Sequence, residues 1–353
     1  MTPQLRIDHS GHLVSGNLLA TLTGESYAKN PGLNYIAPSG ALTMNQDNLI
    51  GQLDRRAKLT VSDSFMFTPK PLAFIGPSTG SEVPDTFVRG IQAQRANSRT
   101  NMAMVTGAYL FTPSVSLQGS YTNSMMRFGT AFNAPNSAQS GASSFFNTSF
   151  QNYNIGPQFQ ITPLDSLSVN YQGSRAHFSQ TRSSFSSKFE TQGGTVGWKR
   201  TFTPTLIADA SAGLTQIGTD ANATLTYLAN GSLEWKHEHG GAMLKYSRSV
   251  FPSFFVVAVP LLSQVITLSG TYGLSSNLSI TGSANYARNE STGGQVQLSF
   301  DSYSTSMSLN YTITRSISAI ASFTHSQFTQ SFIGNEFSFN RNVVSLSLRG
   351  EWN

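Results

Sequence analysis

Two histidines near the middle of the chain could bind a metal ion. The residues from Lys236 to His239 read KHEH, and His237 and His239 share a face if this segment is extended. Two imidazoles at that spacing could hold one divalent cation between them. No further ligand follows at an established motif spacing, and the neighbouring Trp235 is typical of a membrane boundary. We therefore expect a hydrated turn here, with no metal and no cofactor.

A second reactive group lies near the N-terminus, where DHSGH spans Asp8 to His12. A serine nucleophile needs a base and an orienting acid aligned in space, and adjacency in sequence does not supply that alignment. The chain contains no G-x-S-x-G, P-loop or dinucleotide motif, and Asp165 and Asp209 belong to different predicted hairpins. We expect a hydrated first strand or a periplasmic segment at DHSGH, and we expect that the protein is not an enzyme.

The most extensive pattern is an alternation of apolar and uncharged polar residues. Within residues 152–173, Tyr153, Ile155 and Phe159 alternate with Asn, Gly and Gln, and after a short turn Val169 and Tyr171 alternate with Ser and Asn. Side chains of a β-strand point to opposite faces with a period of two. Each predicted strand therefore has one apolar face and one neutral, hydrogen-bonding face.

This strand–turn–strand unit recurs along the chain. Its short turns contain Pro, Gly, Asn and Ser, and longer, irregular segments join one unit to the next. That asymmetry predicts an all-β protein: a transmembrane antiparallel up-and-down β-barrel of about 16 strands, with short periplasmic turns and long extracellular loops. We expect residues 1–353 to form this single domain.

The composition agrees with a membrane barrel. Only 11% of the residues are charged, and the chain has no cysteine and no apolar run that predicts a spanning helix. The net charge of +5 is scattered rather than gathered in a basic patch, so we expect no nucleic-acid partner. The N-terminal MTPQLRIDHSGH lacks the features of a signal peptide, so we expect a chain whose export signal has been removed.

In such a barrel the apolar face contacts lipid and the polar face lines the lumen. Aromatic residues beside the short turns, such as Trp235 and Tyr272, predict a girdle at the membrane boundary. A neutral lumen wall with isolated charges predicts a water-filled conduit with at most a mild preference for anions. The lumen-lining candidates are Lys58, Asn170, Gln172, Lys199, Asp209, Lys245, Thr267, Thr281 and Asn285.

Two segments could narrow this conduit. Residues 70–99 combine Pro, Gly and aromatic residues with Arg89, Arg95 and Arg99, so they could form a folded-in constriction loop or an ordinary external loop. Residues 251–262 are unusually apolar for a solvated loop. They could rest on lipid, enter the lumen or contact a partner subunit.

The last strand carries a family resemblance. VVSLSLRGEWN places Val344, Leu346, Leu348 and Trp352 on one face, one residue before the terminal Asn353. This segment resembles the C-terminal signature of bacterial outer-membrane β-barrel proteins, which the barrel-assembly machinery reads. The whole chain, including SDSFMFTP at residues 62–69, also resembles large porin-like barrels found near exopolysaccharide and sorting loci.

The resemblance implies a protein of the bacterial outer membrane, in contact with the lipid bilayer and lipopolysaccharide. The leading hypothesis is a porin-like channel that passes small hydrophilic solutes, or a neutral polymer such as a polysaccharide, without a cofactor. The alternative is a plugged structural barrel that scaffolds a secretion or electron-transfer partner. A homo-oligomer is among the expected assemblies, and an all-β surface protein such as an adhesin is the third reading.

Overall fold

The computed structural model describes residues 3–25, 35–68, 96–131, 146–179, 186–219, 222–253, 259–292, 298–332 and 335–350. These residues form 17 strands and one short helix. In chain order they are β1 Gln4–Ser10, β2 Ser15–Glu25, β3 Tyr35–Asn45, α1 Asp47–Leu53, β4 Ala57–Thr68, β5 Ala96–Thr112, β6 Val115–Ala131, β7 Asn147–Gln160, β8 Asp165–Ser179, β9 Ser186–Thr203, β10 Leu206–Thr219, β11 Ala223–His237, β12 Gly240–Pro252, β13 Pro260–Gly273, β14 Leu278–Ser291, β15 Leu298–Thr314, β16 Ile317–Phe332 and β17 Asn335–Gly350.

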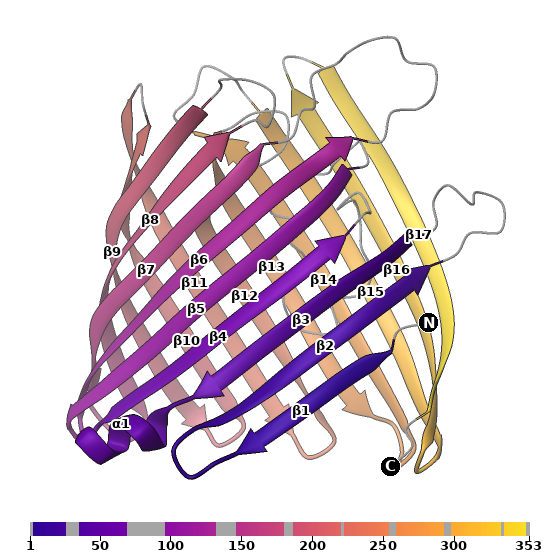
Figure 1. The fold of residues 1–353 in the computed structure, drawn as a ribbon, viewed down its shortest axis with the longest axis horizontal. Coiled ribbons are helices and arrows are strands. Elements are labelled where there is room, and N and C mark those ends of the chain that lie inside the picture. Colours follow the sequence, from indigo (N-terminus) through magenta and orange to yellow (C-terminus); the bar gives the residue numbers. More distant parts are fainter. Residues whose placement is uncertain are drawn as a thin grey trace.

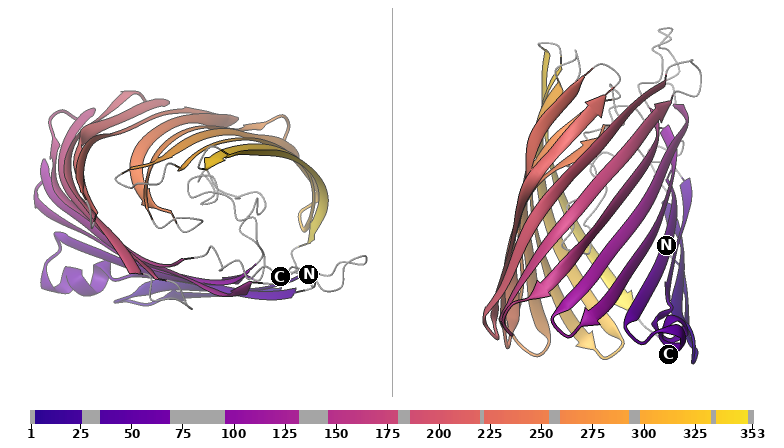
Figure 2. Two further views of the ribbon diagram at one scale, coloured as in Figure 1. Left: turned by 90° about the horizontal axis from the view of Figure 1, so that it is seen from above. Right: turned by 90° about the vertical axis from the view of Figure 1, so that its left-hand side faces the viewer.

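Each strand pairs antiparallel with the next strand in sequence, from β1 to β17. The strands are strongly tilted and the sheet curls around a central interior (Figures 1 and 2). Tilt is required for a sheet to close on itself. The fold is therefore an up-and-down β-barrel, as predicted, with β1 and β17 as edge strands of the described sheet.

The strand number differs from the predicted value of about 16. The additional strand is β1, which includes the DHS residues of the hydrated N-terminal segment and pairs with β2 from Gln4↔Thr21 to Ser10↔Ser15. All seven side chains of β1 are exposed, which distinguishes this strand from the strands that line the far half. Leu5 and Ile7 of β1 alternate with Gln4, Arg6 and Asp8, but two apolar positions in a seven-residue strand are too few to identify a wall strand from the sequence pattern.

A hydroxyl group shapes most of the short turns. At Thr112, Thr162, Thr203, Ser275 and Thr314 the side-chain oxygen accepts a hydrogen bond of 3.2–3.3 Å from the backbone N–H two residues later. Such Ser and Thr bonds stabilise a turn without help from distant residues. This local chemistry explains why the hairpins were recognisable in the sequence.

Near α1 a carboxylate has the same role. Asp54 accepts a backbone hydrogen bond from Arg56 at 2.9 Å and a hydroxyl hydrogen bond from Tyr109 at 2.8 Å. The bond from Arg56, followed by that from Tyr109, lowers the pKa of the Asp54 carboxyl.

Within the described residues, no helix is both long and apolar enough to cross a membrane.

Burial identifies the inner and outer faces of the sheet. On β8, Ala176 and Phe178 are fully buried, whereas Val169 and Tyr171, on the other face, are 48% and 47% exposed. In a single curved layer, only the enclosed face can bury side chains completely. The Ser, Asn and Gln residues of β8 share the face of Phe178, so the polar face lines the interior and the apolar face is the outer surface.

Candidate functional site

The predicted lumen-lining residues all lie on the interior face. Strand alternation and pairing place Lys58 on β4, Asn170 and Gln172 on β8, Lys199 on β9, Asp209 on β10, Lys245 on β12, Thr267 on β13, and Thr281 and Asn285 on β14. Their exposure is uneven: Lys58, Lys199, Asp209, Lys245 and Thr281 are exposed to the interior, and Thr267 is 5% exposed.

Five of these residues belong to one row of paired positions that crosses the wall. Asp209 is the register partner of Lys199 on one side and of Ser232 on the other. The row continues through Lys245, Thr267, Asn285, Ser304 and Ser326, one residue on each strand from β12 to β16. Because the strands are tilted, this row rises from the short turns towards the opposite end of the barrel (Figure 1). We call these eight residues, Lys199 to Ser326, the polar row.

Neighbouring hydroxyl groups of the interior bond to one another across strands. Ser283 and Ser306 lie 2.7 Å apart, and Thr271 and Thr281 lie 3.2 Å apart. Each hydroxyl keeps spare donor or acceptor capacity after one such bond. The wall can therefore exchange hydrogen bonds with water or with a hydroxyl-rich solute.

The interior charges of the described strands are more often basic than acidic. Lys236 forms an ion pair of 3.0 Å with Glu234, and Arg6 one of 2.8 Å with Asp8. Among the described side chains, the remaining acid on this face is Asp209, opposite Lys199. The interior-facing charged residues are Arg6, Asp8, Lys58, Lys199, Asp209, Glu234, Lys236, Lys245, Arg341 and Arg349.

The interior changes character away from the short turns, a feature that sequence reasoning missed. Phe146, Phe150, Ala176, Phe178, Phe189 and Ile217 form one buried apolar cluster on β7–β10. On β15 and β16, Phe300 and Phe328 are 2% and 1% exposed, with ring centroids 5.6 Å apart. The sequence signal was available, because these residues occupy polar-face positions at the strand ends farthest from the short turns.

We call the interior around Lys199, Asp209, Lys245 and Thr281 the turn half, and the interior around Phe178, Phe189, Ile217, Phe300 and Phe328 the far half.

Part of β12 and β13 enters the far half. Val250 packs against the β7–β10 cluster, and Phe251 packs against Val265 and Ala287. Ser253 and Leu261 are fully buried. Of the three alternatives for residues 251–262, the described positions therefore favour entry into the interior; residues 254–258 lie outside the described residues.

The predicted arginine constriction is only partly described. Arg89 and Arg95 lie outside the described residues. Arg99 lies on β5, where alternation with the buried Ser98 places it on the outer face. Its guanidinium carbon is 5.8 Å from the ring centroid of Phe67. The structure therefore does not bring Arg99 to the interior.

The two histidine-containing segments, Lys236–His239 and Asp8–His12, contact different neighbours. His237 stacks on Trp235 with ring centroids 5.5 Å apart, and His239 lies 5.9 Å from His237. In the described part of the chain, no group of three or more His, Cys, Asp or Glu residues is arranged to hold a metal ion. Asp8 of the N-terminal group is paired with Arg6.

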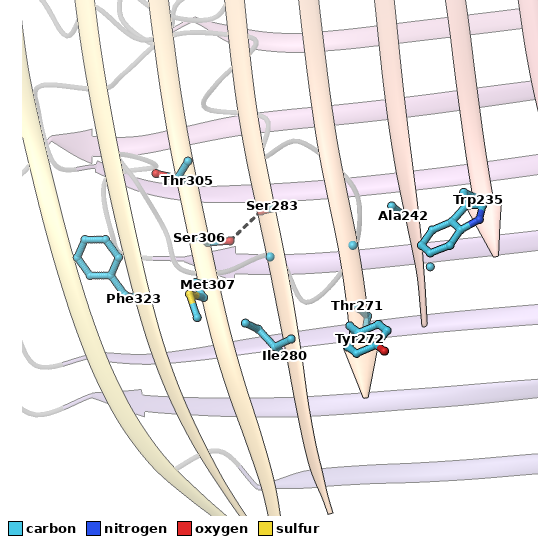
Figure 3. Close-up of a pocket in the computed structure, with 13 residues that line it drawn as sticks. Trp235, Ala242, Thr271, Tyr272, Ile280, Ser283, Thr305, Ser306, Met307 and Phe323 are labelled. Carbon is cyan, nitrogen blue, oxygen red and sulfur yellow. Dashed lines mark hydrogen bonds between the residues drawn. The ribbon is translucent and has the colours of Figure 1, made fainter. Parts of the chain in front are cut away.

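A hollow of about 620 Å³ is lined mainly by outer-face residues of β11–β16, together with Gly241, Thr271, Ser283 and Ser306 of the interior face. It follows the small residues Ala242, Gly270 and Gly282, with Trp235 at one end and Phe323 at the other (Figure 3). These residues share the apolar face of β11–β16. Most of its lining is apolar, and none of the eight residues of the polar row lines it.

The predicted assembly signal is partly described. Val344, Leu346 and Leu348 lie on the outer face of β17 and are 73–80% exposed. Trp352 lies outside the described residues. Recognition by the assembly machinery stays a prediction.

Comparison with known proteins agrees with this architecture. The model of the family described as "Putative beta-barrel porin 2" matches residues 168–351, just over half of the chain. The chain belongs to this porin family. None of the curated protein sequences matches it.

Solved structures share the fold of this porin-family chain. The ferripyoverdine receptor of the outer membrane of Pseudomonas aeruginosa matches with a TM-score of 0.50 and 10% identity, over 100% of this chain and 57% of the receptor. The FrpB iron transporter from Neisseria meningitidis, in its apoprotein form, matches with a TM-score of 0.54 and 8% identity, over 94% of this chain and 59% of the transporter. The chain thus spans less than two thirds of these neighbours, and at this identity they show the fold alone.

The family and the fold place the protein in the bacterial outer membrane. The recognition of an outer-membrane barrel from the sequence is confirmed.

Proposed function

We propose that the protein is a porin-like channel that passes small hydrophilic solutes, or a neutral polymer such as a polysaccharide, passively through the outer membrane. The observation that carries this proposal is the polar row. It places hydroxyl, amide and charged groups at paired positions on eight neighbouring strands, from Lys199 to Ser326. A solute that loses water on entering the barrel would find replacement hydrogen bonds along this path.

The excess of basic groups on the interior face supports a mild preference for anions. Lys245 is exposed and has Ser232 and Thr267 as its register partners. Water screens an exposed charge strongly, so isolated lysines bias the passage of ions without excluding cations. No catalytic step or cofactor is part of the proposal.

The far half would be the narrow part of this channel. The apolar side chains of Val250 and Phe251 pack against interior clusters of the barrel. They occupy space there that water would fill in an open, hydrated conduit. A solute must pass beside these groups or displace them. Residues 250–253 and 259–262 are therefore the constriction that the described residues support, whereas residues 70–95 lie outside them.

We also propose how the barrel is oriented in the membrane and that it contacts lipopolysaccharide. We place the short turns in the periplasm and the far half towards the outside, as in other outer-membrane barrels. Outward-facing Arg99 and Arg127 are register partners near the far end of β5 and β6, and both are exposed. Phosphate groups of lipopolysaccharide would neutralise such a pair.

The burial of the far half favours one alternative. With Phe178, Phe189 and Ile217 at most 1% exposed, the barrel could instead be a plugged scaffold for a secretion or electron-transfer partner. A scaffold would need no continuous hydrated path.

Planar-bilayer recording of the refolded full chain separates these functions. We expect stepwise openings, and we expect Phe251→Ser to raise the unitary conductance because it removes an apolar ring from the constriction. Met243→Ser is the matched control, since Met243 lies on the same strand and face but in the turn half. Inserted protein that stays silent in the wild type and in both variants would support the plugged scaffold instead.

A further inference from the structure

The wall of the barrel is not continuous between β11 and β12. Their pairing runs from His237↔Gly240 to Ala229↔Arg248 and ends there. β11 continues to Ala223 paired with β10 alone, and β12 continues to Pro252 paired with β13 alone. In the described residues, the two strands therefore separate in the far half, where the end of β12 turns inward.

Separated strands leave backbone groups without a ladder partner. Inside a membrane each such group costs free energy, so open sheet edges are normally avoided there. Arg248, the last paired residue of β12, compensates for part of this loss. Its Nε donates a hydrogen bond of 3.3 Å to the carbonyl oxygen of Tyr227, and its guanidinium carbon lies 3.9 Å from the Tyr227 ring centroid.

Apolar side chains lie on both faces of β11 at the separation. Leu225 and Tyr227 of β11 are 67% and 51% exposed on the outer face. Leu228, the next residue, points inward and is 5% exposed. Behind it lies the far half, in which Val250 of β12 packs against the β7–β10 cluster. A molecule that crosses the wall here would meet Leu225, Tyr227, Leu228 and Val250 together with the hydroxyl groups of Thr224, Thr226 and Ser249. This mixed lining suits an amphipathic molecule.

We propose that apolar or amphipathic small molecules exchange between the membrane and the far half through a lateral opening between β11 and β12, with Arg248 as its latch. This route goes beyond the proposed hydrophilic conduit, because it enters through the wall and not along the barrel axis. The described sheet has other breaks, because β1 and β17 are edge strands and the β3–β4 pairing ends at Ser39↔Met66. The β11–β12 separation differs from these because Val250, at its edge, packs against the buried β7–β10 cluster of the far half. Opening requires the Arg248–Tyr227 contacts to break and β12 to move away from β11.

The absence of cysteine from the sequence allows a direct test. Leu228→Cys places a single thiol behind the opening. Val265→Cys is the matched control, because Val265 is also interior and 6% exposed but is paired on both sides, with Ser247 and Ala287. Each full-length variant is reconstituted in phosphatidylcholine vesicles and exposed to N-phenylmaleimide, which partitions into the bilayer, or to a charged maleimide, which does not.

We expect N-phenylmaleimide to modify Cys at position 228 faster than at position 265, while the charged reagent shows no such difference. Adding Arg248→Ala should accelerate labelling at position 228 by about tenfold, because hydrogen bonds from charged groups typically contribute that much to an equilibrium. Labelling at position 265 should not change. Circular dichroism and heat-modified gel mobility verify that each variant is folded.

Equal labelling of the two positions by N-phenylmaleimide would overturn the lateral route. An Arg248→Ala effect of the same size at both positions would overturn the role of Arg248, since general loosening does not depend on site. Preferential labelling of position 228 by the charged reagent would show a hydrated path and would also contradict the proposal. Bilayer conductance along the barrel axis is a separate measurement, so failure here leaves the channel proposal to its own test.

Discussion

The turn half and the far half of the interior are built from the same strands but have opposite characters. On β8, Asn170 and Gln172 lie in the turn half, and Phe178 lies on the same face a few residues later. On β15 the corresponding change is from Ser306 and Ser308 to Phe300. The alternation of faces is thus constant along a strand, whereas the environment of one face is not. The polar interior can meet water, and the aromatic interior must be covered by protein.

The two halves therefore have different roles: the far half stabilises the barrel, and the turn half is available to a passing solute. Buried rings in the far half contribute packing energy, as the cores of soluble proteins do. Exposed polar residues in the turn half contribute little to packing and remain available to a solute. Substitutions in the far half should therefore change stability, and substitutions in the turn half should change passage.

Phe178→Ala should destabilise the barrel strongly. Phe178 is fully buried with its ring centroid 5.9 Å from that of Phe189. Its truncation should lower the free energy of unfolding by about 3–5 kcal/mol, as for large-to-small changes in packed cores. Urea unfolding in phospholipid vesicles measures the change. Asn170→Ala, on the same strand and face, should cost less than about 0.5 kcal/mol; equal losses would remove the distinction between the halves.

Ser174→Ala tests the boundary between the two regions. The Ser174 and Thr191 hydroxyls are 2.7 Å apart, and both residues are buried. Removing one leaves the other without its partner away from water, which should cost about 1–3 kcal/mol. Ser306→Ala breaks the Ser283–Ser306 bond in the turn half, where water can replace it. We expect the Ser306 variant to lose less than about 0.5 kcal/mol in the same assay.

Lys245→Glu should have the smallest effect and should act on ion selectivity rather than on stability. We expect the reversal potential under a salt gradient to shift towards cation preference. The shift should grow in dilute salt, because the screening length increases from about 10 Å at 0.1 M to about 30 Å at 0.01 M. Arg127→Glu, on the outer face, is the control. A larger shift from Arg127→Glu than from Lys245→Glu would contradict the assignment of the interior face.

The amino-acid sequence by itself determined the class of fold and the two faces of the wall. Local causes are sufficient for both: Thr162 and its counterparts shape their own turns, and alternation places Asn170 and Val169 on opposite sides of any strand. The same alternation placed every lumen-lining candidate on the interior face. It did not count β1 among the wall strands, because that strand has only seven residues and two apolar positions, Leu5 and Ile7.

Only the tertiary structure decided what happens within the interior. Register across several strands brings Lys199, Lys245 and Asn285 into one row, although they are far apart in the sequence. The contact of Val250 in β12 with the β7–β10 cluster joins strands that are not neighbours in sequence order. The contact of Arg248 with Tyr227 depends on the point at which the β11–β12 pairing ends. A period-two pattern specifies the face of a residue, whereas its depth, partners and exposure are fixed when the sheet curls.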